Sequence, residues 1–267
     1  MNTDLLALPE RATKPRASGL TLMIDNGIPP RYFEDVVDGA NQFIDIVKFG
    51  WGTSVITETL DRKIACLRER GIGYYFGGTL FEKFLAQGQV DAYRAYCQRY
   101  GCRYVEISNG TIELTNREKA RYITRFARDF HVLSEVGYKD SERSLKLHPG
   151  QWIEYINEDM MAGAERVITE ARESGSSGIF RPDGEVRYGL IEEMLASGLD
   201  TTRLIFEAPR KDQQVYFIRR VGANVNLANI APGDLIGLET LRLGLRADTL
   251  LDFDAAPRAS AARSAAS

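Results

Sequence analysis

The sequence has little of the material from which most metal, redox and dinucleotide sites are built. It contains only two histidines, His131 and His148, which argues against a histidine-rich zinc site. The three cysteines, Cys66, Cys97 and Cys102, form no CxxC pair, and this favours reduced thiols over disulfides. No GxGxxG follows the first predicted strand, so the usual sign of a dinucleotide-binding fold is missing.

Charge and hydropathy argue against two further classes. A net charge of −3 gives no basic surface for nucleic acid. No apolar run approaches the roughly 20 residues that span a membrane, and the N-terminus lacks the apolar core of a signal peptide. The composition, 44% hydrophobic and 27% charged, is that of an ordinary globular protein. We therefore expect a cytoplasmic protein with no nucleic-acid or membrane partner.

Short apolar runs alternate with helical patterns along most of the chain. Leu60, Ile64 and Leu67 recur at helical spacing, and Thr115 with Glu118 forms a capping box. Strands that alternate with helices indicate a parallel sheet covered by helices, and eight such units favour a closed (β/α)8 TIM-type barrel over an open sheet. The predicted strands are Leu20–Asp25, Phe43–Lys48, Gly73–Phe76, Tyr104–Ser108, Val132–Glu135, Val167–Glu170, Leu204–Glu207 and Val225–Leu227.

The two ends of the chain lack this alternation. Residues 1–18 show little periodicity and are predicted to form an N-terminal arm, so that a single barrel domain occupies residues 19–254. Residues 255–267, AAPRASAARSAAS, cannot bury a core and are predicted to be a disordered tail. One barrel of about 250 residues accounts for the length without a second domain.

Ionisable or amide side chains close nearly every predicted strand, whereas the residues before them are apolar. In a barrel of this type the C-terminal ends of the strands form the active-site face. We therefore expect these side chains to converge on one mouth. They are Asp25, Lys48, the Gly77–Thr79 turn, Glu106, Ser108, Glu135, Glu170, Arg172, Glu173, Glu207, Asn226 and Asn229.

Several carboxylates at one mouth require positive charge, because like charges repel. We predict that Glu106, Glu135 and Glu170 bind a divalent metal, and Mg²⁺ fits carboxylate and amide oxygens better than zinc does. A structural alternative stands beside this prediction. Each of the three glutamates could instead pair across the barrel with Lys48 or Arg172.

Positive and amide groups near the same strand ends predict an anionic substrate. The guanidinium of Arg172 offers a planar fork suited to phosphate or carboxylate, and Lys139 adds a point charge. The glycines of residues 173–178, ESGSSG, would let backbone N–H groups approach an anion closely. We thus predict a small phosphorylated or polyanionic acid as substrate. The candidate substrate-binding residues are Lys48, Arg172, Ser174, Gly175 and Asn226.

Seven motifs follow one another along the predicted strand ends. They are VKFGWGT (47–53), GGTLFE (77–82), VEISNG (105–110), SEVGYKD (134–140), ITEARESG (168–175), LIFEAP (204–209) and NVNLANI (224–230). In this order they resemble the phosphosulfolactate synthase family. IDNG at 24–27 and LRLGLR at 241–246 are more similar to its bacterial branch. Asn26 is a departure, because archaeal members commonly carry a lysine after the aspartate.

This resemblance implies a TIM-type barrel, a homo-oligomer and the Mg²⁺-dependent addition of sulfite to phosphoenolpyruvate, which gives (2R)-3-phosphosulfolactate. Attack on the methylene carbon builds negative charge on the carboxylate, which a bound metal stabilises, and a general acid then protonates the adjacent carbon. We predict Lys139 as this acid, with Lys48 as a second catalytic candidate. Among neighbouring cations, Lys139 is expected to have a lowered pKa.

Two other functions stay open on the sequence. A lyase or aldolase acting on a phosphorylated keto acid would use Lys48 or Lys139 to form a Schiff base. A barrel without catalytic activity could act as a binding or stress protein, since plant heat-stress proteins resemble the same barrel.

Overall fold

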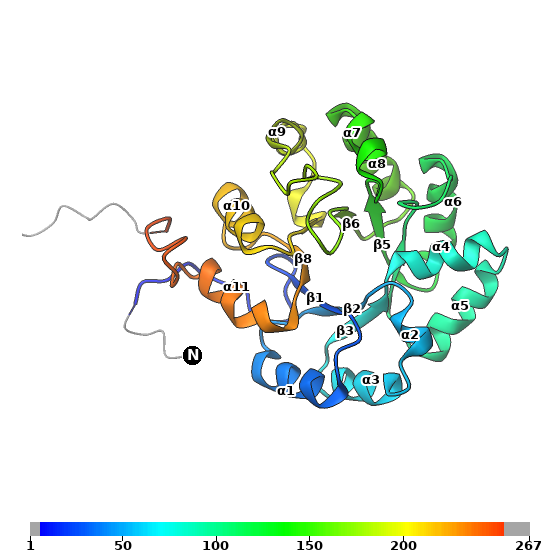
Figure 1. The fold of residues 1–267 in the computed structure, drawn as a ribbon, viewed down its shortest axis with the longest axis horizontal. Helices are drawn as coiled ribbons and strands as arrows, with labels where there is room; N and C mark the ends of the chain where they lie inside the picture. Colours follow the sequence, from blue (N-terminus) through cyan, green and yellow to red (C-terminus); the bar gives the residue numbers. More distant parts are fainter. Residues whose placement is uncertain (1–5, 254–267) are drawn as a thin grey trace, which may run out of the picture.

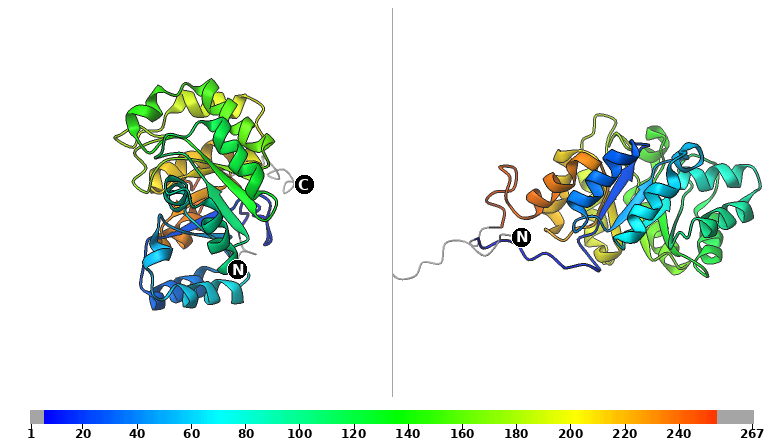
Figure 2. Two further views of the ribbon diagram at one scale, coloured as in Figure 1. Left: turned by 90° about the vertical axis from the view of Figure 1, so that its right-hand side faces the viewer. Right: turned by 90° about the horizontal axis from the view of Figure 1, so that it is seen from below.

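The computed structural model describes residues 6–253, and within them eight parallel strands form a ring that helices surround (Figures 1 and 2). The strands are β1 (Thr21–Asp25), β2 (Ile46–Phe49), β3 (Gly73–Phe76), β4 (Tyr104–Ile107), β5 (His131–Val136), β6 (Arg166–Thr169), β7 (Leu204–Glu207) and β8 (Leu227–Ile230). The helices are α1 (Pro30–Ala40), α2 (Thr53–Ile56), α3 (Leu60–Glu69), α4 (Gly78–Ala86), α5 (Val90–Arg99), α6 (Asn116–Phe126), α7 (Ser141–Lys146), α8 (Pro149–Met161), α9 (Tyr188–Ala196), α10 (Lys211–Val221) and α11 (Leu235–Arg242). The predicted (β/α)8 barrel is confirmed.

The ring closes where β3 meets β4. Backbone pairing runs in the order β3-β2-β1-β8-β7-β6-β5-β4, and the two end strands lie alongside each other. At this seam the ring of Tyr104 packs against Gly73, where any Cβ would come within 2.7 Å of a ring carbon. Close packing of an aromatic ring explains why a residue with poor strand propensity begins β3.

Most strand boundaries agree with the prediction, but two shifts affect the site. β2 begins at Ile46 rather than Phe43, so Lys48 is followed by Phe49 inside the strand. The prediction for the eighth strand, 225–227, is wrong, because β8 occupies Leu227–Ile230. Asn226 therefore precedes its strand instead of lying near the C-terminal end.

Two apolar layers stabilise the barrel. The larger lies between the strands and the outer helices, and it includes the outward-facing Val47, Val105 and Val167. The smaller fills the barrel interior and consists of Leu20, Leu22, Ile46, Tyr75, Leu133, Ile168, Ile205 and Ala228, with Tyr104 packed against it. Because side chains alternate between the faces of a strand, the interior layer determines which later residues face the barrel axis.

The N-terminal arm is attached to the barrel by its basic side chains. Arg11 forms an ion pair of 2.9 Å with Glu239 and donates to the carbonyl of Ala223 at 3.1 Å. Lys14 donates to the carbonyl of Asn41 at 2.8 Å. The predicted tail at 255–267 lies outside the described residues. Within residues 6–253, no helix is both long and apolar enough to cross a membrane.

Candidate active site

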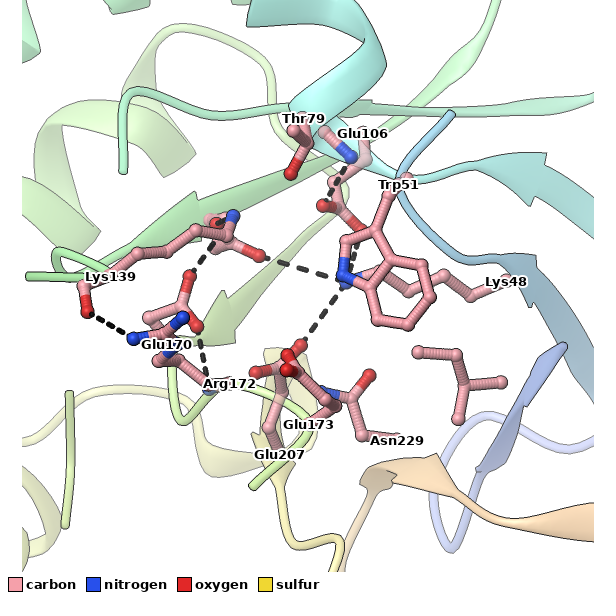
Figure 3. Close-up of a pocket in the computed structure, with 14 residues that line it drawn as sticks. Lys48, Trp51, Thr79, Glu106, Lys139, Glu170, Arg172, Glu173, Glu207 and Asn229 are labelled. Atoms are coloured by element: carbon pink, nitrogen blue, oxygen red, sulfur yellow. Dashed lines mark hydrogen bonds and ion pairs between the residues drawn. The ribbon is translucent and has the colours of Figure 1, made fainter. Parts of the chain in front are cut away.

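At the C-terminal end of the barrel, a layer of charged side chains lies next to the interior apolar layer. Each lies two positions after an interior side chain on the same strand, so alternation directs both toward the barrel axis. A pocket opens at this end, and these charged residues line it (Figure 3). The pairs are Ile46 and Lys48, Tyr104 and Glu106, Leu133 and Glu135, Ile168 and Glu170, and Ile205 and Glu207.

Lys48 lies at the centre of a buried ion-pair network. Its Nζ atom is 3.0 Å from Glu106 Oε2, 3.1 Å from Glu207 Oε1 and 3.7 Å from Glu135 Oε2. Burial by itself would lower the pKa of Lys48, but the carboxylates of Glu106 and Glu207 raise it well above its ordinary value. The side chain is therefore a fixed positive charge at neutral pH.

Lys139 enters the pocket from the loop after β5, on the opposite side from Lys48, and the two lysines share Glu135 as a partner (Figure 3). Its Nζ atom lies 3.3 Å from Glu135 Oε1 and 3.3 Å from Glu170 Oε2. The expectation of a lowered pKa is wrong here. Burial acts in that direction, but Glu135 and Glu170 outweigh it and raise the pKa of Lys139, because its nearest charges are carboxylates rather than cations.

The carboxyl groups of the pocket have different pKa values because their surroundings differ. Burial raises the pKa of Glu106 to about 7, against the opposing effect of Lys48. Burial and the adjacent Glu135 raise the pKa of Glu170 well above its ordinary value. For Glu135 burial acts upward too, but Lys139 and Lys48 outweigh it and lower the pKa to about 2. The pocket thus combines a carboxylate that ionises at unusually low pH, Glu135, with two carboxyl groups that keep their protons to unusually high pH.

Backbone N–H groups orient three of the four carboxyl groups that pair with Lys48 or Lys139. Gly78 N donates to Glu106 at 2.6 Å, Ala171 N to Glu207 at 2.9 Å, and Arg172 N to Glu170 at 2.6 Å. In each case the second oxygen is the one that lies next to a lysine ammonium group. The fixed backbone therefore positions these three carboxyl groups before any ligand binds.

Three residues of the pocket have a left-handed backbone. Trp51 has φ = 49°, Arg172 has φ = 60° and Asn229 has φ = 58°, and within residues 6–253 these are the non-glycine residues with positive φ. All three line the pocket. This conformation costs roughly 1–2 kcal/mol per residue and concentrates at functional sites. Their coincidence at one mouth identifies it as the functional end of the molecule.

Asn229 reaches the pocket through an irregularity in β8. Thr21 pairs with Leu227 and Met23 with Ile230, so β8 has one more residue than β1 between these two pairs. Such a bulge re-aims a side chain. Regular alternation after the inward Ala228 would turn Asn229 outward, yet its amide lines the pocket. The amide is buried, and its Oδ1 accepts no hydrogen bond from residues 6–253.

The structure corrects the placement of Asn226. Its amide nitrogen donates to the carbonyl of Leu204 at 2.8 Å, and its Oδ1 accepts from the N–H of Leu20 at 3.0 Å. Both partners lie at the N-terminal ends of strands, away from the pocket. Asn226 therefore joins three strands, and Asn229 is the asparagine at the mouth.

Ser174 and Gly175 also lie outside the pocket lining. The hydroxyl of Ser174 is 2.6 Å from that of Ser176 on the exposed surface, and the carbonyl of Gly175 accepts from Gln213 at 2.9 Å. Gly175 has φ = 64°, and a Cβ there would collide with Gln213. The glycine thus serves chain packing, and Arg172 and Glu173 are the residues of this loop that line the pocket.

Several pocket residues are absent from the predicted substrate and metal ligands, and Glu207 and Thr79 are two of them. Glu207 closes β7 two positions after the interior Ile205, so its spacing was a usable signal. Thr79, in the second position of α4, reaches the pocket lining through the GGT turn. A glutamate or a threonine at such a position can bind a ligand or stabilise the fold, and the sequence alone does not show which atoms surround it.

The pocket contains the types of oxygen atom that Mg²⁺ prefers as ligands. Glu106 Oε2, Glu170 Oε2 and Asn229 Oδ1 are buried and accept no hydrogen bond from the described part of the chain, although lysines lie beside the first two. Carboxylate and amide oxygens are the ligands of hard cations. Within residues 6–253, however, no three acidic, histidine or cysteine side chains are close enough to form a metal-binding group, because Lys48 and Lys139 lie between the carboxylates.

A barrel with a lysine–carboxylate network at the C-terminal ends of its strands has the architecture of a TIM-barrel enzyme. A family model described as (2R)-phospho-3-sulfolactate synthase (ComA) matches residues 9–248. A phosphosulfolactate synthase of Bacillus subtilis is 54% identical over 93% of this chain and 99% of its own. A phosphosulfolactate synthase of Methanothermobacter thermautotrophicus is 41% identical over 94% and 98%, respectively.

This chain therefore belongs to the phosphosulfolactate synthase family and is an enzyme of that family. The predicted resemblance to the bacterial branch is confirmed by the high identity to the Bacillus protein. Among solved structures, a 3-hexulose-6-phosphate synthase from Salmonella typhimurium superimposes with a TM-score of 0.53 at 14% identity, over 85% of this chain and 100% of that chain. At this identity the likeness concerns the fold alone.

Proposed function

We propose that this enzyme catalyses the addition of sulfite to phosphoenolpyruvate, giving (2R)-phospho-3-sulfolactate. The sulfur lone pair forms a C–S bond with the methylene carbon, the π electrons move toward the carboxylate, and a proton is added to the carbon that carries the phosphate. The phosphate ester stays intact, so no leaving group is needed. The observation that carries the proposal is the joint presence of two protonated lysines and oriented carboxyl groups in one pocket of a chain that belongs to this family.

The two lysines suit different roles. The side chain of Lys139 is 23% exposed, whereas that of Lys48 is 10% exposed and pairs with three carboxylates. Lys139 can therefore meet a substrate in the pocket, and its raised pKa keeps it protonated until it delivers the proton. Lys48 instead holds the carboxylates in place and contributes positive potential under the substrate.

Arg172 and Asn229 are the proposed contacts for the anionic groups of the substrate. Both line the mouth, and their left-handed backbones fix the direction in which the side chains leave the chain. A guanidinium binds a phosphate or carboxylate through two parallel hydrogen bonds. The amide nitrogen of Asn229 offers a further donor in place of the predicted Asn226.

We also propose Mg²⁺ as the cofactor, with Glu106, Glu135 and Glu170 as its ligands. Lys48 and Lys139 separate these carboxylates in this structure, so the three side chains would have to move together to hold the cation. Two of these carboxyl groups each have a buried oxygen that accepts no hydrogen bond from the described residues, and Asn229 adds an amide oxygen. When bound, the cation supplies positive charge for the carboxylate on which negative charge develops. The same charge would offset the glutamates that raise the pKa of Lys139 and make this lysine a better proton donor.

A Schiff-base lyase is the alternative, and the electrostatics disfavour it. Imine formation needs a neutral amine, yet neighbouring carboxylates raise the pKa of both Lys48 and Lys139. Borohydride in the presence of a phosphorylated keto acid would trap an imine as a covalent adduct detectable by mass spectrometry. A stable adduct on either lysine would favour the lyase.

Phosphorus NMR tests the proposed function directly. The protein is incubated with phosphoenolpyruvate, sulfite and Mg²⁺, and the enol-phosphate signal should be replaced by that of an alkyl phosphate ester. Omitting sulfite should leave the enol phosphate unchanged. Conversion without sulfite, or release of inorganic phosphate, would overturn the proposal.

A further inference from the structure

Glu82 is a buried carboxylate outside the pocket that binds a single loop through four hydrogen bonds. It lies on α4 and is 2% exposed. Its Oε1 accepts from the hydroxyl of Ser108 at 2.5 Å and from Gly110 N at 3.1 Å. Its Oε2 accepts from Thr111 N at 2.8 Å and from Ile112 N at 3.0 Å. These four donors occupy both oxygens, so Glu82 is satisfied by the β4–α6 loop alone.

The same loop lies against the group that performs the proposed proton transfer. The carbonyl of Gly110 accepts a hydrogen bond from Lys139 N at 3.1 Å. A Cβ at Gly110 would come within 3.4 Å of both Glu135 Oε1 and Lys139 Cγ, and within 3.5 Å of Glu170 Oε2. The backbone at Gly110 thus covers the side of the Lys139 stem and determines how far the lysine enters the pocket.

Helix α4 connects this loop to the other side of the pocket. Its first residue, Gly78, donates its N–H to Glu106 at 2.6 Å, and Glu82 lies one helical turn later. Because the two contacts come from one rigid helix, the position of Glu106 and the position of the loop are set together. Glu82 does not line the pocket, so its effect on the reaction is indirect.

We infer that Glu82 is a positioning residue for Lys139. Its carboxylate holds residues 108–112 in one conformation, the carbonyl of Gly110 then fixes the backbone N–H of Lys139, and the ammonium group is thereby placed between Glu135 and Glu170. The effect on turnover rests on the proposed function. The restraint on the loop does not, because it follows from the hydrogen bonds alone.

The variant Glu82→Gln tests both parts. Glutamine keeps the volume, but its amide nitrogen cannot accept a hydrogen bond. In place of Oε2 it would face the N–H groups of Thr111 and Ile112, and in place of Oε1 it would face that of Gly110. We expect backbone hydrogen exchange at residues 110–112 and at Lys139 to become about tenfold faster or more. We expect kcat to fall by about tenfold or more, with KM for phosphoenolpyruvate within about threefold of wild type, because misplacement of a reacting group by ~1 Å is costly.

Glu118→Gln is the matched control. Glu118 is also a helix carboxylate that accepts a backbone N–H, that of Thr115 at 2.9 Å, but it is exposed and remote from the pocket. Its replacement should leave exchange at 110–112 and kcat unchanged. If Glu82→Gln does not fold, Ser108→Ala removes the hydroxyl donor alone and should produce a smaller effect on exchange and turnover in the same direction.

Hydrogen exchange separates the possible failures. Unchanged exchange at residues 110–112 and Lys139 in Glu82→Gln would overturn the inferred restraint, whether or not the wild-type enzyme uses sulfite. Faster exchange with wild-type kcat in an active enzyme would overturn the positioning role. Faster exchange together with a kcat loss that KM does not share would support it.

Discussion

The Nζ atom of Lys139 lies 3.3 Å from a carboxylate oxygen of Glu170, so the proposed proton donor is paired with a proposed metal ligand. Lys48 and Lys139 together pair with four glutamates. When Glu106 and Glu170 are protonated, the two lysine charges balance the two remaining carboxylate charges. A substrate with several negative charges would upset this balance. Additional positive charge is needed before such a substrate can be held.

The first prediction is that the enzyme requires a divalent cation. Removal of metal with EDTA should abolish conversion of phosphoenolpyruvate and sulfite, and Mg²⁺ or Mn²⁺ should restore it, because the pocket offers oxygen ligands. Isothermal titration with Mg²⁺ alone would measure binding independently of turnover. Full activity in metal-free buffer would contradict the assignment.

The second prediction concerns the planar fork of Arg172. Arg172→Lys keeps the charge but loses bidentate geometry, so KM for phosphoenolpyruvate should rise by roughly 10- to 100-fold, as expected for hydrogen bonds to a charged group. The free energy of unfolding should change little, because Arg172 is exposed. An unchanged KM would assign the residue to the structure of the loop.

The third prediction compares Asn229, which lies in β8, with Asn226, which precedes this strand. Asn229→Ala should raise KM for phosphoenolpyruvate by about tenfold or more through loss of an amide contact, with little effect on the unfolding free energy. Asn226→Ala should do the reverse and destabilise the fold by about 1–3 kcal/mol, because it leaves the buried backbone groups of Leu204 and Leu20 without a partner. Equal effects of the two changes on KM would refute this division.

The regular alternation of side chains along the strands is enough to predict part of the site. Glu106, Glu135 and Glu170 could be placed at one mouth because apolar strands end in charged residues and barrels have a fixed active-site face. Asn229 could not be chosen over Asn226, because its direction depends on a bulge and a left-handed φ that arise from pairing with β1. The spacing of residues in the sequence does not predict the irregular register between β1 and β8.

The electrostatics of the site were harder still to predict. The sequence shows Lys139 near several charges, but only the distances to Glu135 and Glu170 decide that its pKa rises rather than falls. The role of Glu82 was likewise hidden, since a glutamate in a helix is usually a surface residue. In both cases the deciding contacts come from segments far apart in the chain.

The fourth prediction is a pH dependence of stability in metal-free enzyme. The pKa of Glu106 is raised to about 7 in the folded protein, mainly by burial, from an ordinary value of 4.5. Between these values the folded state binds more protons than the unfolded state, so the free energy of unfolding should fall as pH rises, by up to about 3 kcal/mol. Urea unfolding should show a steeper fall in the wild type than in Glu106→Gln, in which Glu170, whose pKa is also raised, still contributes a fall of the same sign. A constant difference between the two proteins from pH 4.5 to 7.5 would contradict it.

The last prediction concerns Lys139 as the general acid. Lys139→Ala should lower the rate of single turnover by roughly 10²–10⁴-fold in saturating phosphoenolpyruvate, sulfite and Mg²⁺, which is the usual contribution of a positioned acid. Lys139→Arg should not restore the rate, because a guanidinium does not release its proton near neutral pH. Solvent deuterium should slow the wild type if protonation limits turnover.

Lys139 can be truncated with less risk to the fold than Lys48. Its side chain is 23% exposed, so solvent can partly stabilise Glu135 and Glu170 after the change. Removal of the more buried Lys48 would leave three carboxylates without their common partner, and breaking such a buried pair costs about 3–5 kcal/mol. Thermal unfolding and titration with phosphoenolpyruvate should therefore show that Lys139→Ala still folds and binds. A single-turnover rate within a few-fold of wild type in that folded variant would exclude Lys139 as the acid, and Lys48 would then be the remaining lysine of the pocket to test.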